Sequence, residues 1–279
     1  MHTTLIDAAT LAAHLDDPDW AVFDCRHALA DFSLGRRLYD ESHIPGAVFA
    51  DVERDLAGEH TGRNGRHPLP APEAFAAYLR SASVSENTQI VAYDAGGDMF
   101  AARLWFMSRW IGHDACAVLD GGFAAWVAAG YPLASAPPKK RTGNIQAHVR
   151  GELVVDAGYV LAHLGDRGVQ IVDARAADRF AGQNETIDPV AGHIPGARNL
   201  PFKSIFSSDG RFKSPAELTA LFAQHGPPER IVHQCGSGVS SAANMLAMEI
   251  AGLRGGRIYA GSWSEWIADP DRPITTGPA

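Results

Sequence analysis

Residues 231–241 read Ile-Val-His-Gln-Cys-Gly-Ser-Gly-Val-Ser-Ser, and this segment indicates both the fold and the chemistry of the chain. Its first four residues are typical of a short buried strand. A helix is predicted over residues 242–251, with Gly252 after its C-terminal end. A strand, a glycine-rich bend and a helix N-terminus in this order direct unpaired backbone N–H groups into the bend. These groups and the helix dipole favour a thiolate, so Cys235 is predicted to be a nucleophile rather than an ordinary buried cysteine.

The chain repeats its own motifs. His-Ile-Pro-Gly-Ala occurs at residues 43–47 and again at 193–197. Phe-Asp-Cys-Arg at 23–26 is matched by Val-Asp-Ala-Arg at 172–175, and Asp-Gly-Gly-Phe-Ala-Ala-Trp at 120–126 by Ala-Gly-Ser-Trp-Ser-Glu-Trp at 260–266. Because the order is the same in both halves, we interpret the chain as a duplicated domain. The predicted domains are residues 1–135 and 151–279, and the linker is 136–150, which includes Pro137-Pro138 and Lys139-Lys140-Arg141.

Strand and helix patterns alternate along both halves. Strands are predicted at 20–24, 89–93, 116–119, 170–173, 230–234 and 257–259, and helices at 72–81, 100–110 and 215–224, with Ser214 as an N-cap. This alternation predicts an α/β fold in which each domain is a mainly parallel sheet flanked by helices. Ligands of such sheets gather at the carboxyl ends of strands, where Cys235 is expected to lie. The first half has Asp94 at the matching point, so only the second half is predicted to be catalytic.

Composition excludes several classes of function. The net charge of −8 and the pI near 5.8 disfavour nucleic acid and acidic membranes as partners. Three widely spaced cysteines, Cys25, Cys116 and Cys235, argue against a disulfide framework and for a reducing, cytoplasmic location. No apolar stretch is long enough to span a membrane. The 12 histidines show no metal-ligand spacing beside cysteine pairs, so no zinc site is expected.

These motifs together resemble the two-domain sulfurtransferases, the family of rhodanese (thiosulfate sulfurtransferase) and 3-mercaptopyruvate sulfurtransferase. The resemblance rests on the paired His-Ile-Pro-Gly-Ala segments, Arg179-Phe180, the cysteine loop and residues 261–266. It implies tandem rhodanese domains with the active loop in the second one. It also implies that the Cys235 thiolate takes sulfur from a small anionic donor, holds it as a persulfide, and passes it to an acceptor, with no metal or organic cofactor. Thioredoxin, glutathione, another thiol or cyanide are all open as acceptors.

The resemblance also assigns roles to residues outside the cysteine. Ser237 matches the loop serine of mercaptopyruvate enzymes, His67 matches their histidine, and Glu53 occupies the carboxylate position, with Asp51 as the alternative. Such a relay would manage the proton when an enolate leaves. Arg179 matches the arginine that binds the anionic end of the donor. The remaining predicted binding residues of the loop are Gly236, Gly238, Val239 and Ser240.

Two features point to different donors. The uncharged cysteine loop resembles that of mercaptopyruvate enzymes, which favours 3-mercaptopyruvate. Those enzymes carry a second arginine nine positions after the first, but here that position is Asp188, as expected of a thiosulfate enzyme. If Asp188 faces the donor it should weaken carboxylate binding, with Arg211 or Lys213 as substitutes.

Other classes fit less well. A cysteine phosphatase needs an arginine six residues after the cysteine, where this chain has Ser241, and the Gly-x-Ser-x-Gly pattern of serine hydrolases is not met. A non-enzymatic binding or regulatory module that kept the duplicated fold is the remaining alternative, and the intact cysteine loop argues against it.

Overall fold

The computed structural model describes residues 1–138 and 142–278, and the predicted basic segment Lys139-Lys140-Arg141 lies outside them. The chain forms two compact units. The first comprises Met1–Gly58, Pro70–Arg150 and Ser207–Phe212, and the second comprises Glu59–Leu69, Gly151–Phe206 and Lys213–Ala279. Each unit therefore includes one short segment from the other half of the sequence. The domain limits given above, with their linker at 136–150, stay a prediction.

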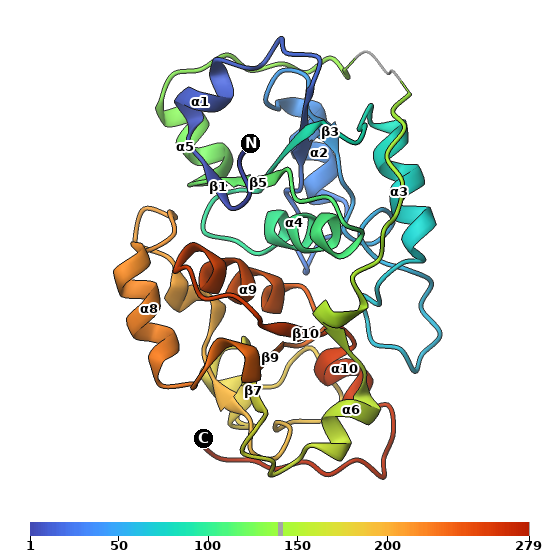
Figure 1. The fold of residues 1–279 in the computed structure, drawn as a ribbon, viewed down its shortest axis with the longest axis vertical. Coiled ribbons are helices and arrows are strands. Elements are labelled where there is room, and N and C mark those ends of the chain that lie inside the picture. Colours follow the sequence, from blue (N-terminus) through green and yellow to red (C-terminus); the bar gives the residue numbers. More distant parts are fainter. Residues whose placement is uncertain (139–141, 279) are drawn as a thin grey trace. The chain divides into compact units, whose positions relative to one another are not determined.

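The first unit is built on a five-stranded sheet in the order β1-β5-β4-β2-β3, in which every pairing is parallel. Helices flank this sheet (Figure 1). The strands are β1 (Leu5–Ile6), β2 (Trp20–Asp24), β3 (Val48–Phe49), β4 (Gln89–Tyr93) and β5 (Cys116–Leu119). The helices are α1 (Ala8–Ala12), α2 (Leu34–Glu41), α3 (Pro72–Ser81), α4 (Phe100–Trp110) and α5 (Gly122–Ala128).

The second unit repeats this topology, with strand order β6-β10-β9-β7-β8 and parallel pairing throughout. Its strands are β6 (Val154–Val155), β7 (Gln170–Asp173), β8 (Arg198–Asn199), β9 (Ile231–Gln234) and β10 (Arg257–Tyr259). Its α-helices are α6 (Ala157–Ala162), α7 (Ala177–Phe180), α8 (Pro215–Ala223), α9 (Ser240–Ile250) and α10 (Ser262–Trp266). Short 3₁₀ turns occur at Gly151–Leu153, Phe202–Ile205 and Pro228–Arg230. The predicted α/β fold of two similar sheets is confirmed.

Local sequence explains most element boundaries. The central strands are short apolar runs, and β2, β4, β5, β7 and β10 have the predicted ends. Ser214 caps α8 as expected, because its hydroxyl accepts from Glu217 N while the Glu217 carboxylate accepts from Ser214 N. Helix α9 begins at Ser240, two residues earlier than predicted. The outer strands β1, β3, β6 and β8 have two residues each, too few to produce a recognisable pattern.

Each sheet packs against an apolar core of its own unit. Val91 and Trp126 are central in the first unit, and Val232, Trp263 and Trp266 in the second, all fully buried. Burying one such side chain contributes about 1.5–3 kcal/mol or more. The two tryptophans of α10 are thus packing residues.

Ion pairs fix the ends of two inner strands. The Arg26 guanidinium lies 2.6 Å from the Asp24 carboxylate, and Arg175 lies 2.7 Å from Asp173. All four side chains are buried, so removing one partner of a pair would leave the other as an uncompensated buried charge. In the second unit this pair lies at the end of β7, four residues before Arg179.

Among residues 1–138 and 142–278, no helix combines the length and apolar character that crossing a membrane requires. Within the same residues, no group of three or more His, Cys, Asp or Glu side chains is arranged to hold a metal ion.

Candidate active site

Cys235 lies directly after β9, the middle strand of the second sheet, and its side chain is only 2% exposed. The loop that follows turns back over the sulfur, so that Gly238 N donates to Cys235 Sγ across 3.1 Å. Sγ also lies 3.8 Å from Ser241 Oγ in the first turn of α9. Glycine is required at 238, because φ is +82° and a Cβ there would lie 2.2 Å from Ala260 O. The loop thus encloses the sulfur in hydrogen-bond donors.

These donors change the ionisation of the sulfur. Burial acts to raise the pKa of Cys235, but hydrogen bonds from Ser240, Ser237 and Ser241 outweigh it and lower the pKa below its usual value of 9.0. The other two cysteines behave in the opposite way. Burial raises the pKa of Cys116 to about 12, and it also raises the pKa of Cys25 well above its usual value. Of the three cysteines, only Cys235 is therefore set up to be a thiolate.

The start of α10 holds the cysteine loop in place. Ser262 Oγ accepts from Cys235 N at 3.1 Å and donates to Tyr259 O at 2.9 Å. On the other side of the loop, Trp263 N donates to Cys235 O at 3.0 Å and Ser264 N to Gly236 O at 2.9 Å. This is a positioning role that the sequence reasoning missed. The repeated motif at 260–266 is the signal in the sequence that could have indicated it.

A loop from the first half of the sequence completes the site. Residues 59–69 belong to the second unit, where Arg66 N donates to Ser264 Oγ at 3.0 Å. The next residue, His67, is buried, and its Nδ1 lies 2.7 Å from Ser237 Oγ. The structure therefore brings together three predicted site residues, Cys235, Ser237 and His67.

The predicted acid of this relay lies in the first unit. Glu53 N donates to Asp51 Oδ1 at 2.9 Å, and the Glu53 carboxylate lies 3.9 Å from His27 Nε2. Support of His67 by either carboxylate stays a prediction.

Three charged residues form a cluster beside the cysteine loop, which we call the arginine bridge: Arg66, Arg179 and Asp188. Asp188 pairs through one oxygen with Arg66 Nη1 and through the other with Arg179 Nη2, the latter at 3.0 Å. Arg179 also pairs with Glu185, at 2.9 Å. Burial lowers the pKa of Arg66, while the negative charge of Cys235 acts to raise it.

The arginine bridge changes the interpretation of Asp188. Asp188 is expected to weaken donor binding only if it faces the donor, but its side chain is 1% exposed and is bound by two guanidinium groups. The suggested substitutes are engaged elsewhere. Lys213 Nζ donates to Ser204 O at 2.7 Å, and Arg211, in the first unit, lies 3.6 Å from Asp120. Arg66 and Glu185 were missed, although Arg66 directly precedes the predicted His67.

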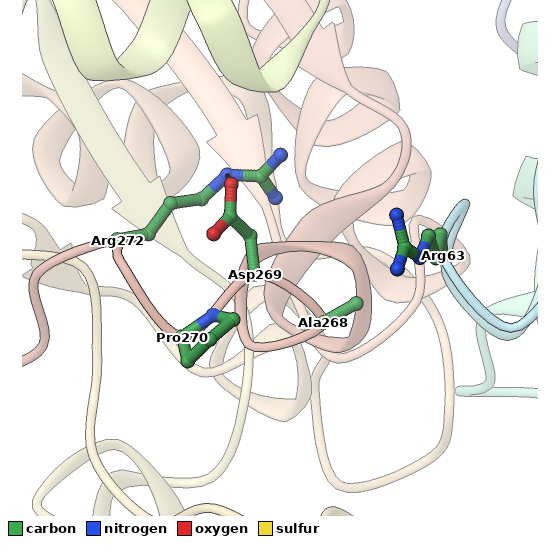
Figure 2. A pocket seen from close by; sticks show the side chains of 5 residues that line it. All are labelled: Arg63, Ala268, Asp269, Pro270 and Arg272. Carbon is green, nitrogen blue, oxygen red and sulfur yellow. Dashed lines mark ion pairs between the residues drawn. The ribbon is translucent and has the colours of Figure 1, made fainter.

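A separate pocket of about 260 Å³ opens elsewhere on the second unit. It is lined by Arg63 of the 59–69 loop and by Ala268, Asp269, Pro270 and Arg272 (Figure 2). Arg272 and Asp269 face each other there at 3.5 Å. This pocket contains none of the predicted site residues.

A family model described as a rhodanese-like domain matches residues 7–129 and 156–269. The chain belongs to the rhodanese family. It is 47% identical over 278 residues, 98% of each chain, to a Pseudomonas aeruginosa protein named "Probable 3-mercaptopyruvate sulfurtransferase". It is also 34% identical to a thiosulfate sulfurtransferase of Cricetulus griseus, covering 87% of this chain and 84% of that one.

A solved structure leads to the same family. SseA from Escherichia coli, a 3-mercaptopyruvate sulfotransferase with the rhodanese fold, superposes with a TM-score of 0.84 and 34% identity, over 94% of this chain and 99% of SseA. The predicted family, the tandem fold and the enzyme class, a sulfurtransferase, are confirmed.

Proposed function

We propose that this rhodanese-family enzyme takes sulfur from 3-mercaptopyruvate, carries it as a persulfide on Cys235, and passes it to a thiol acceptor. The observation that carries the choice of donor is the 2.7 Å contact between His67 Nδ1 and Ser237 Oγ, two residues from the nucleophile. Thiosulfate releases sulfite, which needs no proton, whereas mercaptopyruvate releases an enolate, which does. The Ser237 hydroxyl paired with the His67 imidazole can supply that proton, which favours 3-mercaptopyruvate as the donor. The naming of the P. aeruginosa relative supports the same donor.

In the first half-reaction, the Cys235 thiolate attacks the sulfur of the donor. An S–S bond forms as the C–S bond breaks, and the electron pair of that bond leaves on carbon as the enolate of pyruvate. Ser237 donates a proton to the enolate carbon and is reprotonated through His67. The terminal S–H of the new persulfide ionises and returns this proton, so protons and charges balance. Arg179 holds the donor carboxylate.

In the second half-reaction, an acceptor thiolate attacks the terminal sulfur and the Cys235 thiolate leaves. The donors that lower the pKa of Cys235, Ser240, Ser237 and Ser241, also favour this leaving group. Gly236, Gly238 and Val239 shape the loop around the same sulfur. Thioredoxin, glutathione and cyanide are the acceptors we propose to compare. We also propose that the enzyme acts in the cytoplasm, because all three of its cysteines are free thiols.

The test supplies each donor separately and measures its product. With 3-mercaptopyruvate and a thiol, the enzyme should release pyruvate, and mass spectrometry of the donor-treated protein should find one added sulfur atom on the peptide containing Cys235. C235S is the control and should do neither. Release of sulfite from thiosulfate, with no pyruvate from mercaptopyruvate, would assign the enzyme to the other donor. Added sulfur on Cys25 or Cys116 would overturn the assignment of the nucleophile.

A further inference from the structure

We propose that Arg66 is a second ligand of the donor carboxylate, working beside Arg179, and that Asp188 is a positioning residue that holds both guanidinium groups. This inference rests on the proposed function and deepens it, since it explains how a chain with an acid at 188 binds a keto acid. It assigns a binding role to the 59–69 loop beyond that of His67.

Exposure shows which charges a donor would meet. In the arginine bridge, the Arg66 and Arg179 side chains are 30% and 17% exposed, whereas the Asp188 side chain is 1% exposed. Glu185, the other acid bound to Arg179, is 2% exposed. The carboxylates thus lie beneath the guanidinium groups. An approaching anion meets N–H donors, and the buried acids keep those donors in place.

The arginine bridge is next to the nucleophile. A Cβ at Gly236, the residue after Cys235, would lie 2.9 Å from Arg66 Nη2 and 3.6 Å from Arg179 Nη2. Both groups therefore lie beside the loop, one residue from the reacting sulfur. Each planar guanidinium presents paired N–H groups that match the two oxygens of a carboxylate. In a mercapto keto acid two carbons separate the carboxylate from the sulfur, so a donor can reach Cys235 and the arginines together.

One loop then supplies two functions. Its backbone is fixed by the hydrogen bond from Arg66 N to Ser264 Oγ, and its side chains reach Asp188 and Ser237 in succession. Arg66 would hold the carboxylate while His67 serves the proton relay. The competing interpretation is that the pair of Arg66 with Asp188 only docks the loop, and the experiment must separate the two.

The experiment measures kcat and KM for 3-mercaptopyruvate, together with the inhibition constant of pyruvate, in the full-length enzyme. The variants are R66Q, R66K and D188N, with R63Q as the matched control because Arg63 lies in the same loop but lines the separate pocket (Figure 2). R66Q should raise both KM and the pyruvate inhibition constant by about tenfold, with a smaller change in kcat. R66K should recover part of the loss, D188N should fall in between, and R63Q should match the wild type.

Three results would overturn the inference. Unchanged KM and pyruvate inhibition in R66Q would remove Arg66 as a ligand. A fall in kcat alone would indicate that Arg66 only docks the loop that carries His67. A lower KM in D188N would show that Asp188 repels the donor. Wild-type enzyme that forms persulfide from thiosulfate but releases no pyruvate would instead refute the proposed donor, so the two failures are distinguishable.

Discussion

The two units contain the same loop with a different anion at its centre. Asp94 follows β4 in the first unit, as Cys235 follows β9 in the second, and each strand is the middle one of its sheet. Asp94 accepts from Gly96 N at 3.0 Å and from Ala101 N at 3.1 Å, whereas Cys235 Sγ accepts from Gly238 N at 3.1 Å. Both loops thus present backbone N–H groups to a buried anionic side chain.

The support behind the two loops is also shared. In the first unit Phe123 N donates to Asp94 O at 2.8 Å, and in the second Trp263 N donates to Cys235 O at 3.0 Å. The amide cradle is therefore a property of the fold that both units have. What differs is the chemistry inside it, because a carboxylate cannot accept a transferred sulfur atom and a thiolate can. The predictions below use this comparison.

The largest effect is expected from C235D, which gives the second loop the side chain of the first. Sulfur transfer should fall by at least about a thousandfold, as expected when a nucleophile is lost. Because the first loop already holds a buried carboxylate, the free energy of unfolding should stay within about 2 kcal/mol of the wild type. Activity assays and urea denaturation check both parts. A variant that does not fold would show that the two cradles are not equivalent.

Loss of the proton relay, the contact between Ser237 and His67 beside the second loop, should have the next largest effect. H67Q and S237A should each reduce kcat for 3-mercaptopyruvate by about a hundredfold or more, the usual contribution of general acid–base catalysis. Turnover of thiosulfate, whose leaving group needs no proton, should change far less. Equal losses with both donors would mean that these residues serve the loop structure instead.

The pH dependence of alkylation should follow the lowered pKa of Cys235. Since the folded pKa is below 9.0, the thiolate persists as the pH falls below 9.0, and its stabilising hydrogen bonds are lost only as the pH falls through the folded pKa. Iodoacetamide should therefore react at Cys235 with a midpoint below pH 9. S240A should raise that midpoint, because it removes a hydrogen bond to the sulfur. Cys25 and Cys116, whose pKa values are raised, are internal controls and should stay unmodified.

The smallest effect concerns residue 262, where the units share a backbone conformation but differ in residue type. Ser262 has φ +54° and the matching Gly122 has φ +56°, a conformation that favours glycine. S262G relieves about 1–2 kcal/mol of strain but loses both hydrogen bonds of the Ser262 hydroxyl, each worth about 1 kcal/mol, so the free energy of unfolding should change by no more than about 1 kcal/mol. S262A keeps the strain and should be about 1–2 kcal/mol less stable than S262G. Thermal or urea unfolding of both variants measures this. Equal stabilities would contradict the strain.

Much of the fold could be predicted from the sequence, because short apolar runs between glycines and polar turns mark the inner strands directly. The start of α9 was placed late, since Ser240 and Ser241 have modest helix propensity alone but are buried in its first turn. For the site, local pattern located Cys235 and the family resemblance located Ser237 and His67.

Pairings between segments far apart in the chain were harder to predict. The burial of Asp188 between two guanidinium groups leaves no pattern in the nearby sequence, because one of its partners, Arg66, is 122 positions away. Arg66 was overlooked for the same reason. The role of Glu53 rests on the family resemblance alone and stays a prediction, and its carboxylate lies 3.9 Å from His27 Nε2 in the first unit.

The membership of residues 59–69 in the second unit has a consequence for how this duplicated enzyme can be divided. A fragment that starts at the linker would keep the nucleophile yet lack Arg66 and His67, and the other fragment would lack 207–212. Dividing the chain at the linker therefore leaves each fragment without a segment that its own unit contains. A catalytic fragment that works alone would therefore need residues 59–69 supplied together with the second half of the sequence.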